Sequence, residues 1–432
     1  MFESPIILNE REAHRARKML ARIDETLSAK AFFQTACLSL PPDVVNMHKK
    51  AIGGSRNTLA AMLNTYEQLR SGTYSDIATN WRGEPGVVLI IARIARGLSQ
   101  SELAAQLGMR EQQVQRYESE RYRSISLQNY RRIAAVLGVE FHASVDPCFG
   151  SWMPRLSGSD QPLISDQQLK TVVEHARKRR WFDVPDAQSE QRRAIIDYVR
   201  ESHSRFGSPG LLRTGLKSLD LKDDALLAVW RARIVARAEE AASKLEGTFD
   251  QLDISWLAEF VKLSAKDEGP VQAIKMAAQK GIVIVAEPQL PGLKLDGAAF
   301  LSGRAPIVGI TIRHDRIDNF WFTLLHELAH VYLHYQAGLA AGFFDDDLDQ
   351  DKSDEIEQEA DQFASSILIP TERWRLSTAR ISRTPGPAEQ FAKQLGIHPA
   401  IVFGRIRRER GDYSLFSDRV GMGKVRNQLY SS

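Results

Sequence analysis

The chain has 432 residues, of which 43% are hydrophobic and 26% are charged, so it can form packed domains and is not a disordered polymer. A chain of this length is expected to form about two to four domains. The net charge of +3 excludes a protein that attracts nucleic acid through its overall charge, so any such surface must be local. Its two cysteines, Cys37 and Cys148, lie too far apart to suggest a disulfide framework or a thiolate zinc site.

The start of the chain carries no obvious targeting signal. The first ten residues lack a basic segment followed by an apolar core, so no signal peptide is expected. No run of about 18 apolar residues is present that could span a membrane. With so few cysteines, these features predict a cytoplasmic protein that does not bind a membrane.

Residues 1–78 are predicted to form a helical arm. Helical patterning covers residues 9–35 and 55–70, and the sequence Leu-Pro-Pro-Asp at 40–43 separates the two. Two helices joined in this way suggest a hairpin or a partner-binding arm. A solvated helical extension explains the pattern equally well, and the two alternatives stay open.

Residues 79–146 carry the pattern of a helix-turn-helix. A first helix covers 87–95, and Ser99 with Glu102 forms a capping box that starts a second helix. Gly108 supplies a sharp turn, and a polar helix follows at 110–118. Two more helices are expected after it, the last of them ending near residue 137. Helix, short turn with Gly and then a polar helix is typical of DNA-binding domains. In the polar helix, the inward-facing residues are predicted to be Val114 and Tyr117.

The same block closely resembles the XRE/Cro-type DNA-binding domain. That resemblance implies that Glu111, Gln112 and Arg116 project into the major groove of a double-stranded DNA operator, and that Gln100 and Arg110 lie near phosphates. The side chains suit this role, because Gln reads adenine, Arg reads guanine and Glu accepts a hydrogen bond from cytosine.

The charge of this block argues for a dimer. Between residues 82 and 140 there are nine Arg and six Glu, a difference of +3, which is low for tight binding by a monomer. A homodimer would bind half-sites about one helical turn apart. The alternative is that the block is a protein-interaction or dimerisation module, since Glu111, Glu118 and Glu120 weaken attraction to phosphate.

A linker is predicted at 147–164, where breaker residues are frequent, and a helical connecting region at 165–262. The basic run at 177–180 is interpreted as a solvated helix end rather than a nucleic-acid site. A long helix at 226–245, which contains Trp230, is predicted to brace the two halves of the protein.

Strands are predicted next. Residues 280–288 form a short apolar strand, and residues 298–312 form two strands around a Ser-Gly turn. An edge strand here could bind an extended peptide by strand addition.

The stretch from 322 to 333 predicts a buried helix that carries possible metal-binding side chains on one face. His326 and His330 lie four residues apart, so both imidazoles can bind one Zn²⁺ at about 2.0–2.1 Å. Glu327 follows directly and can take a proton from a water at that ion. His334 continues the spacing, but lies about 12 Å of helix rise from His326 and is too far away to share the metal.

The third ligand is expected from an acidic helix at 354–370. Glu357 and Asp361 again lie four residues apart, so Glu357 can complete a His₂Glu site while Asp361 accepts the second N–H of a ligating histidine. Glu355 and Glu359 are nearby competitors, and we interpret both as part of a solvated acidic face.

The HELAH sequence and the acidic helix E-x-x-A-D-Q-F-A-x-x-I-L-I-P resemble the ImmA/IrrE family of zinc metallopeptidases, from about residue 268 to the end. The resemblance implies a small thermolysin-like (gluzincin) α+β fold. It also implies that His326, His330 and Glu357 are ligands, that Glu327 is the general base, and that a repressor, antitoxin or toxin protein is cleaved.

Several features around this region have open roles. The acidic residues at 345–351 form either a surface loop or a substrate- or calcium-binding segment, and residues 389–405 look like a helix-turn-helix that packs the core. His398 precedes a proline and is a poor ligand candidate. The candidates for stabilising an oxyanion are Tyr332, His334, Tyr335 and His314.

Together these patterns predict a mainly α protein. Its parts are a helical arm, a five-helix DNA-binding domain, a linker, a helical connecting region and a C-terminal peptidase domain at 263–432. We expect a DNA-binding regulator fused to a zinc endopeptidase. The alternative is a non-proteolytic antitoxin or repressor with a structural or sensory zinc site, in a toxin–antitoxin or phage-defence module.

Overall fold

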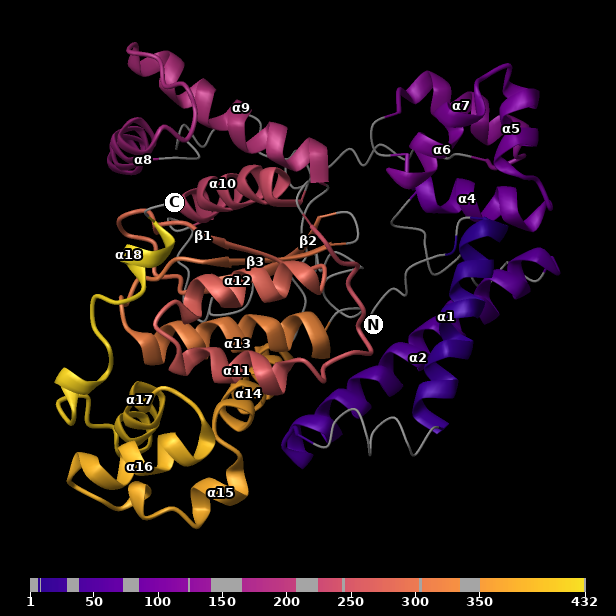
Figure 1. Cartoon of the computed structure of the whole chain (residues 1–432). Helices are drawn as coiled ribbons and strands as arrows, with labels where there is room; N and C mark the ends of the chain where they lie inside the picture. The colour runs from indigo at the N-terminus through magenta and orange to yellow at the C-terminus, as the bar shows by residue number, and fades with distance from the viewer. Residues whose placement is uncertain are drawn as a thin grey trace. The chain divides into compact units, whose positions relative to one another are not determined.

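The structure is a computed structural model (Figure 1). It describes residue 7 and residues 9–28, 39–72, 85–122, 125–140, 165–206, 224–242, 245–302, 305–334 and 350–430. The predicted linker, the acidic stretch at 345–349 and both cysteines lie outside these residues.

The chain divides into two compact units. Unit 1 comprises residues 1–28 and 53–158, and unit 2 comprises residues 29–52 and 159–432. The division falls within helix α2 (Pro42–Arg70), whose first part therefore belongs to unit 2. The five segments predicted from the sequence, together with their boundaries, stay predictions.

The helical arm of unit 1 begins with α1 (Glu10–Ser28). The Asn9 side chain accepts a hydrogen bond from the Glu12 backbone N–H at 2.9 Å, which caps the helix start. The second helix was predicted from residue 55, but α2 begins at Pro42. A proline is tolerated in the first turn because no backbone donor is needed there. Leu-Pro-Pro-Asp does precede the second helix, but the predicted start at residue 55 is wrong because it misses residues 42–54, nearly half of α2.

Four helices follow in the described part of unit 1. They are α4 (Pro85–Ala95), α5 (Gln100–Leu107), α6 (Glu111–Ser119) and α7 (Leu127–Val136). One helix follows α6 in residues 120–140, where two were predicted, because Arg121 and Tyr122 adopt positive φ angles of 49° and 58° that end helical structure. A fifth helix of this domain would lie outside the described residues.

Unit 2 is built around a small mixed sheet. Its strands are β1 (Val283–Ala286), β2 (Gly297–Ser302) and β3 (Ala305–Ile310), in the order β1-β3-β2. β1 pairs parallel to β3, and β2 pairs antiparallel to it, so β2 lies at an edge. The three predicted strands are confirmed, with the turn at 303–304 outside the described residues.

Helices cover both faces of this sheet (Figure 1). On one face lies α10 (Asp224–Ala242), which contacts β1 and β3 and which packs against α8 (Asp166–Arg179) and α9 (Gln188–Phe206). A Cβ atom at Gly309 of β3 would lie 2.9 Å from the Trp230 ring, so glycine allows this close approach. This helix therefore belongs to the sheet core of unit 2, and its role as a brace between the two halves stays a prediction.

The other face of the sheet carries α12 (Gly269–Gln279) and α13 (Ile317–Leu333) (Figure 1). α13 is almost wholly buried and packs against α14 (Gln350–Leu368). The remaining elements of unit 2 are α11 (Leu257–Lys262), η2 (Leu263–Ala265), α15 (Thr371–Arg375), η4 (Thr378–Arg380), α16 (Pro385–Leu395), α17 (Pro399–Arg410), η5 (Ser417–Arg419) and α18 (Arg426–Leu429).

The first part of α2 is also part of the unit 2 core. Leu40 and Val44 are buried among residues of α11, α13 and α14. His48 is fully buried, and its Nε2 donates a hydrogen bond to the Gln251 carbonyl at 2.8 Å. Within the described residues, none of the helices is both long enough and apolar enough to cross a bilayer.

Candidate metal centre

Three side chains from two helices converge beside the sheet. The Nε2 atoms of His326 and His330, one turn apart on α13, lie 3.1 Å from each other. The Glu357 carboxylate on α14 lies 3.2 Å from His326 Nε2 and 3.7 Å from His330 Nε2. In the described part of the chain, this is the group of His, Cys, Asp and Glu residues arranged to hold a metal ion.

These spacings fit a tetrahedral metal. For ligands bound at about 2.0–2.1 Å, the edges of a tetrahedron measure about 3.3 Å. The distances between the His326, His330 and Glu357 ligand atoms bracket that value. Among the described residues the ligand set is therefore two nitrogens and one carboxylate, and catalytic zinc sites likewise use three protein ligands and keep a fourth position for water or substrate.

The outer nitrogen of His326 is fixed by an ion-paired carboxylate. Its Nδ1 lies 3.0 Å from the Asp361 carboxylate, and Arg408 of α17 holds that carboxylate at 2.6 Å. Because Nδ1 donates to Asp361, the Nε2 lone pair points toward the metal position. The sequence placed Asp361 in this role on one histidine or the other, and the structure pairs it with His326. Arg408 was not anticipated.

The outer nitrogen of His330 is held by a second chain of contacts. Its Nδ1 lies 3.0 Å from His334 Nδ1, and His334 Nε2 lies 3.3 Å from Glu359. Lys50 in the first part of α2 pairs with Glu359 at 2.8 Å. If His330 coordinates through Nε2, it must donate from Nδ1, and His334 must then donate from Nε2 to Glu359. Glu359 is therefore engaged with His334 and Lys50 and is not part of a free solvated face.

Glu327 lies beside this centre with one oxygen unpaired. It is 3% exposed, and within the described residues its Oε2 has no hydrogen-bond partner. Burial raises the pKa of Glu327 to about 8, and the carboxylates of Glu357 and Asp296 add to the shift. An orphaned buried carboxylate oxygen is costly unless it serves a ligand or a reaction.

Gly297, at the start of β2, makes room for Glu327. A Cβ atom at this position would lie 2.8 Å from both the Cγ and the Oε1 of Glu327, and 3.0 Å from the Thr323 methyl group. Any larger side chain would displace the carboxylate. The edge strand and the candidate general base thus lie against each other, a contact between distant segments that was not predicted from the sequence.

Electrostatics around the histidines suit a cation. Burial opposes protonation of His326, but hydrogen bonds to Asp361 and Glu357 raise its pKa to about 10. Burial lowers the pKa of His330 well below its usual value, so this imidazole stays neutral as ligation requires. The surroundings of His326 and Glu357 therefore favour one positive charge. A divalent ion can supply that charge in place of the proton on His326.

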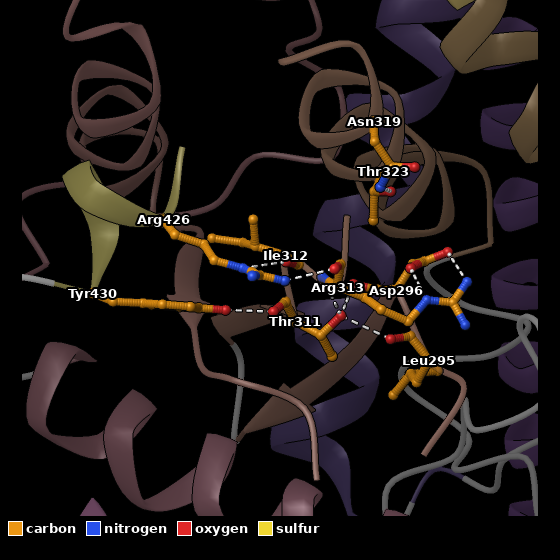
Figure 2. Close-up of polar contacts among 9 residues, drawn as sticks. All are labelled: Leu295, Asp296, Thr311, Ile312, Arg313, Asn319, Thr323, Arg426 and Tyr430. Atoms are coloured by element: carbon orange, nitrogen blue, oxygen red, sulfur yellow. Dashed lines mark hydrogen bonds and ion pairs between the residues drawn. The ribbon is translucent and has the colours of Figure 1, made fainter. Parts of the chain in front are cut away.

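Polar contacts hold the segment that precedes Gly297 (Figure 2). Arg313 pairs with Asp296 at 3.0 Å, and the Thr311 hydroxyl donates to the Leu295 carbonyl at 2.7 Å. These contacts connect the end of β3 to the start of β2 and so fix the backbone next to Glu327.

The C-terminal helix α18 supports the same turn. Arg426 donates from Nε to the Ile312 carbonyl at 3.0 Å and from Nη2 to the Arg313 carbonyl at 2.6 Å. The Tyr430 hydroxyl donates to the Thr311 carbonyl, and Figure 2 shows both side chains reaching the strand end. Arg426 and Tyr430 therefore stabilise the segment after β3, which in turn holds the residues before Gly297.

The candidates for stabilising an oxyanion differ in their location and in their hydrogen-bond partners. Tyr332 is buried, and its hydroxyl accepts a hydrogen bond from Trp256 at 2.9 Å inside the core. His334 is occupied by His330, and His314 is exposed with no hydrogen bond to the centre among the described residues. Tyr335 lies outside the described residues. His398, judged a poor ligand, accepts the Ala400 N–H as the cap of α17.

A cavity adjoins the centre on the side of Arg408. Its volume is about 200 Å³, and its lining combines apolar side chains, among them Phe322, Leu368 and Ile401, with charged ones that include Asp318, Arg405 and Arg408. The Arg408 guanidinium lies 4.7 Å from the Phe322 ring, which itself lies 6.3 Å from the His326 ring. The cavity is therefore one helical turn from the candidate metal position.

In unit 1, the residues predicted to contact DNA surround helix α6. Arg110, Glu111, Gln112 and Arg116 are exposed, while Val114, with Tyr117, faces the core as predicted. The capping box of α5 is present, and Gly108 ends that helix with a φ of 61°. Gln100 is half-buried, and its amide donates to Glu118 at 2.8 Å.

Glu118 does not weaken phosphate attraction, contrary to expectation. Its side chain is fully buried, and Arg93 of α4 binds it through Nε at 2.5 Å and Nη2 at 2.8 Å. The pair is electrically neutral and joins α4 to α6. Because the pair buries one positive and one negative charge, the net charge of +3 counted for residues 82–140 is unchanged, while α6 exposes one carboxylate fewer than expected.

Comparison with known families agrees with both regions. Residues 89–143 match the family model described as helix-turn-helix, and residues 277–398 match the model described as IrrE N-terminal-like domain. Neither the curated proteins nor the solved structures contain a match. The chain thus joins a helix-turn-helix segment of the DNA-binding class to a segment of a peptidase family, as the two resemblances predicted.

Proposed function

We propose that this chain is a cytoplasmic DNA-binding regulator fused to a zinc-dependent endopeptidase that cleaves a partner protein. The observation that carries the proposal is the convergence of the His326, His330 and Glu357 ligand atoms within 4.8 Å of one another. The unpartnered Oε2 of Glu327 beside them supports a hydrolytic role over a purely structural metal site.

Zn²⁺ bound by these three side chains would polarise a scissile carbonyl and acidify a water. Glu327 accepts the proton of the attacking water at Oε2 and passes it to the leaving amine. Burial raises the pKa of Glu327, which favours its holding the proton between the two transfers. Asp361, through His326, and His334, through His330, keep the ligating nitrogens in position.

The substrate side of the proposal uses the edge strand and the adjoining cavity. β2 has one free edge in the described sheet and begins at Gly297, next to Glu327. An extended segment of a partner could pair with that edge by strand addition, so that its carbonyl lies near Glu327. The cavity beside Phe322 would then receive one side chain of the segment, and the apolar part of its lining favours an apolar residue.

The proposal also includes a homodimer that binds an operator through α6, with Glu111, Gln112 and Arg116 at the bases. Gln100 and Arg110 would lie near the phosphates, and a toxin–antitoxin or phage-defence role suits such a fusion. The partner that is cleaved would be a repressor, an antitoxin or a toxin.

The test uses the purified full-length chain loaded with zinc and a library of peptides from digested cell protein. Mass spectrometry should detect new peptide ends with the wild-type chain and none with Glu327→Gln, whose rate should fall about 10²–10⁴-fold. Glu355→Gln is the matched control, because this carboxylate is exposed on α14. If the library stays intact with zinc-loaded wild type that binds DNA, the non-proteolytic repressor is the better account. Equal cleavage by Glu327→Gln would show that the assigned base is wrong.

A further inference from the structure

A groove in unit 1 separates the arm from helix α6. Its volume is about 840 Å³. One wall is formed by the first turns of α1, including Arg11 and Arg15, and another by the exposed residues Gln112 and Arg116 of α6. The arm thus contributes side chains to the same groove as the helix predicted to read DNA.

The groove-facing cations of α1 lack carboxylate partners. Arg11 and Arg15 are exposed, and neither forms an ion pair within the part of the chain that the structure describes. By contrast, Arg17 and Arg70 both bind Glu10, at 2.8 Å and 2.7 Å. Glu10, one of the carboxylates that line the groove, is therefore neutralised by other arginines, and Glu12 and Glu111 line the groove as well.

The cations continue along one face of the helix. Arg11, Arg15 and Lys18 follow at intervals of four and three residues, so they lie on one side of α1, and all three are exposed. The opposite side carries the buried residues Ala13, Ala16, Ile23 and Thr26. A basic stripe that ends at the groove is the surface a polyanion would bind.

We propose that α1 is a second DNA-contacting element, in which Arg11 and Arg15 bind backbone phosphates that flank the bases contacted by α6. This inference rests on the proposed DNA binding through α6. DNA is favoured over an acidic protein because the other wall of the groove carries an amide and a guanidinium, the groups that bond to base edges. A duplex held by α6 would present its phosphates to the adjacent wall. The arm would thus add affinity without sequence preference.

The test is the salt dependence of binding to a random-sequence 30-bp duplex, followed by fluorescence anisotropy with the full-length chain. Each lost phosphate contact should reduce the slope of log affinity against log salt by about 0.9. Arg11→Gln/Arg15→Gln should therefore reduce the slope by about 1.8. Between 50 mM and 200 mM salt, wild type should lose about tenfold more affinity than this variant.

Two further variants make the result specific. Lys170→Gln/Arg383→Gln removes the same charge from exposed positions of unit 2, and its slope should equal that of wild type. Gln112→Ala/Arg116→Ala should change the sequences enriched from a random library, whereas Arg11→Gln/Arg15→Gln should leave them unchanged.

The outcomes separate the two proposals. If wild type binds duplex DNA but Arg11→Gln/Arg15→Gln keeps its slope, the role of α1 is refuted while DNA binding stands. Tighter binding by this variant would mean that α1 obstructs DNA, which also overturns the inference. If wild type binds no duplex, both proposals are wrong.

Discussion

The candidate metal centre and helix α6 use polar side chains in opposite ways. His326, His330 and Glu357 are largely or wholly buried, and each imidazole is held by a partner outside the ligand set. Gln112 and Arg116 on α6 are exposed. A buried polar group needs a hydrogen-bond partner within the protein, whereas an exposed one can bond to water until a ligand binds. Removing a buried group should therefore affect folding or metal binding, and removing an exposed one should affect DNA binding alone.

The largest effect on stability is expected at the buried ion pair of unit 1. Arg93→Met leaves the Glu118 carboxylate buried without its cation and should reduce the free energy of unfolding by about 3–5 kcal/mol. Arg93→Met/Glu118→Leu should recover most of this loss because no charge is left unpaired. Urea denaturation followed by circular dichroism measures both. An Arg93→Met variant as stable as wild type would show that a buried carboxylate can lose its partner without loss of stability, which would contradict the distinction drawn between buried and exposed polar groups.

The next effect concerns the metal. Asp361→Ala removes the carboxylate that orients His326 and should weaken zinc binding about 10–100-fold. Competition with a chromophoric chelator measures the affinity. Glu355→Ala, on the exposed side of α14, should leave it unchanged. Equal effects of the two variants would mean that the outer carboxylate has no orienting role.

A pH effect is expected at His48. Burial lowers its pKa from 6.5 to about 4, so the folded protein favours the neutral imidazole. This contribution to stability is fully present above pH 6.5 and declines as the pH falls toward about 4. The free energy of unfolding should therefore fall by about 2 kcal/mol between about pH 7.5 and pH 5.

His48→Gln keeps a donor for the Gln251 carbonyl but cannot be protonated. The loss of stability between the two pH values should therefore be smaller in this variant by about 2 kcal/mol, as measured by urea denaturation. An identical pH dependence in variant and wild type would contradict the assignment to His48.

The smallest effect on stability is expected on α6. Gln112→Ala/Arg116→Ala removes exposed side chains and should change the free energy of unfolding by less than about 0.5 kcal/mol. The same variant should lose sequence selectivity on DNA. A large loss of stability would indicate that these two side chains stabilise the fold and are not free to bind DNA.

The spacing of residues along single helices made much of the candidate metal centre, and the start of α5, predictable from the sequence. The helical period alone predicted that His326 and His330 share a face, and that Glu357 and Asp361 do so on a second helix. The capping box at Ser99 and Glu102 likewise located the start of α5. These signals act over three or four residues, so a single sequence is enough to find them.

Contacts between distant segments could not be predicted in the same way. Lys50 reaches Glu359 across 309 positions, and Arg408 reaches Asp361 across 47. Such pairs depend on how helices pack, and no local pattern encodes that packing. The burial of Glu118 against Arg93 was missed for the same reason, so Glu118 was wrongly counted among the exposed carboxylates of α6.

The metal content of the purified chain tests the central claim most directly. Elemental analysis should find about one zinc ion per wild-type chain, the same for Glu327→Gln, and close to none for Glu357→Ala. A wild-type chain that takes up no divalent metal, or a Glu357→Ala variant that retains it fully, would contradict the account.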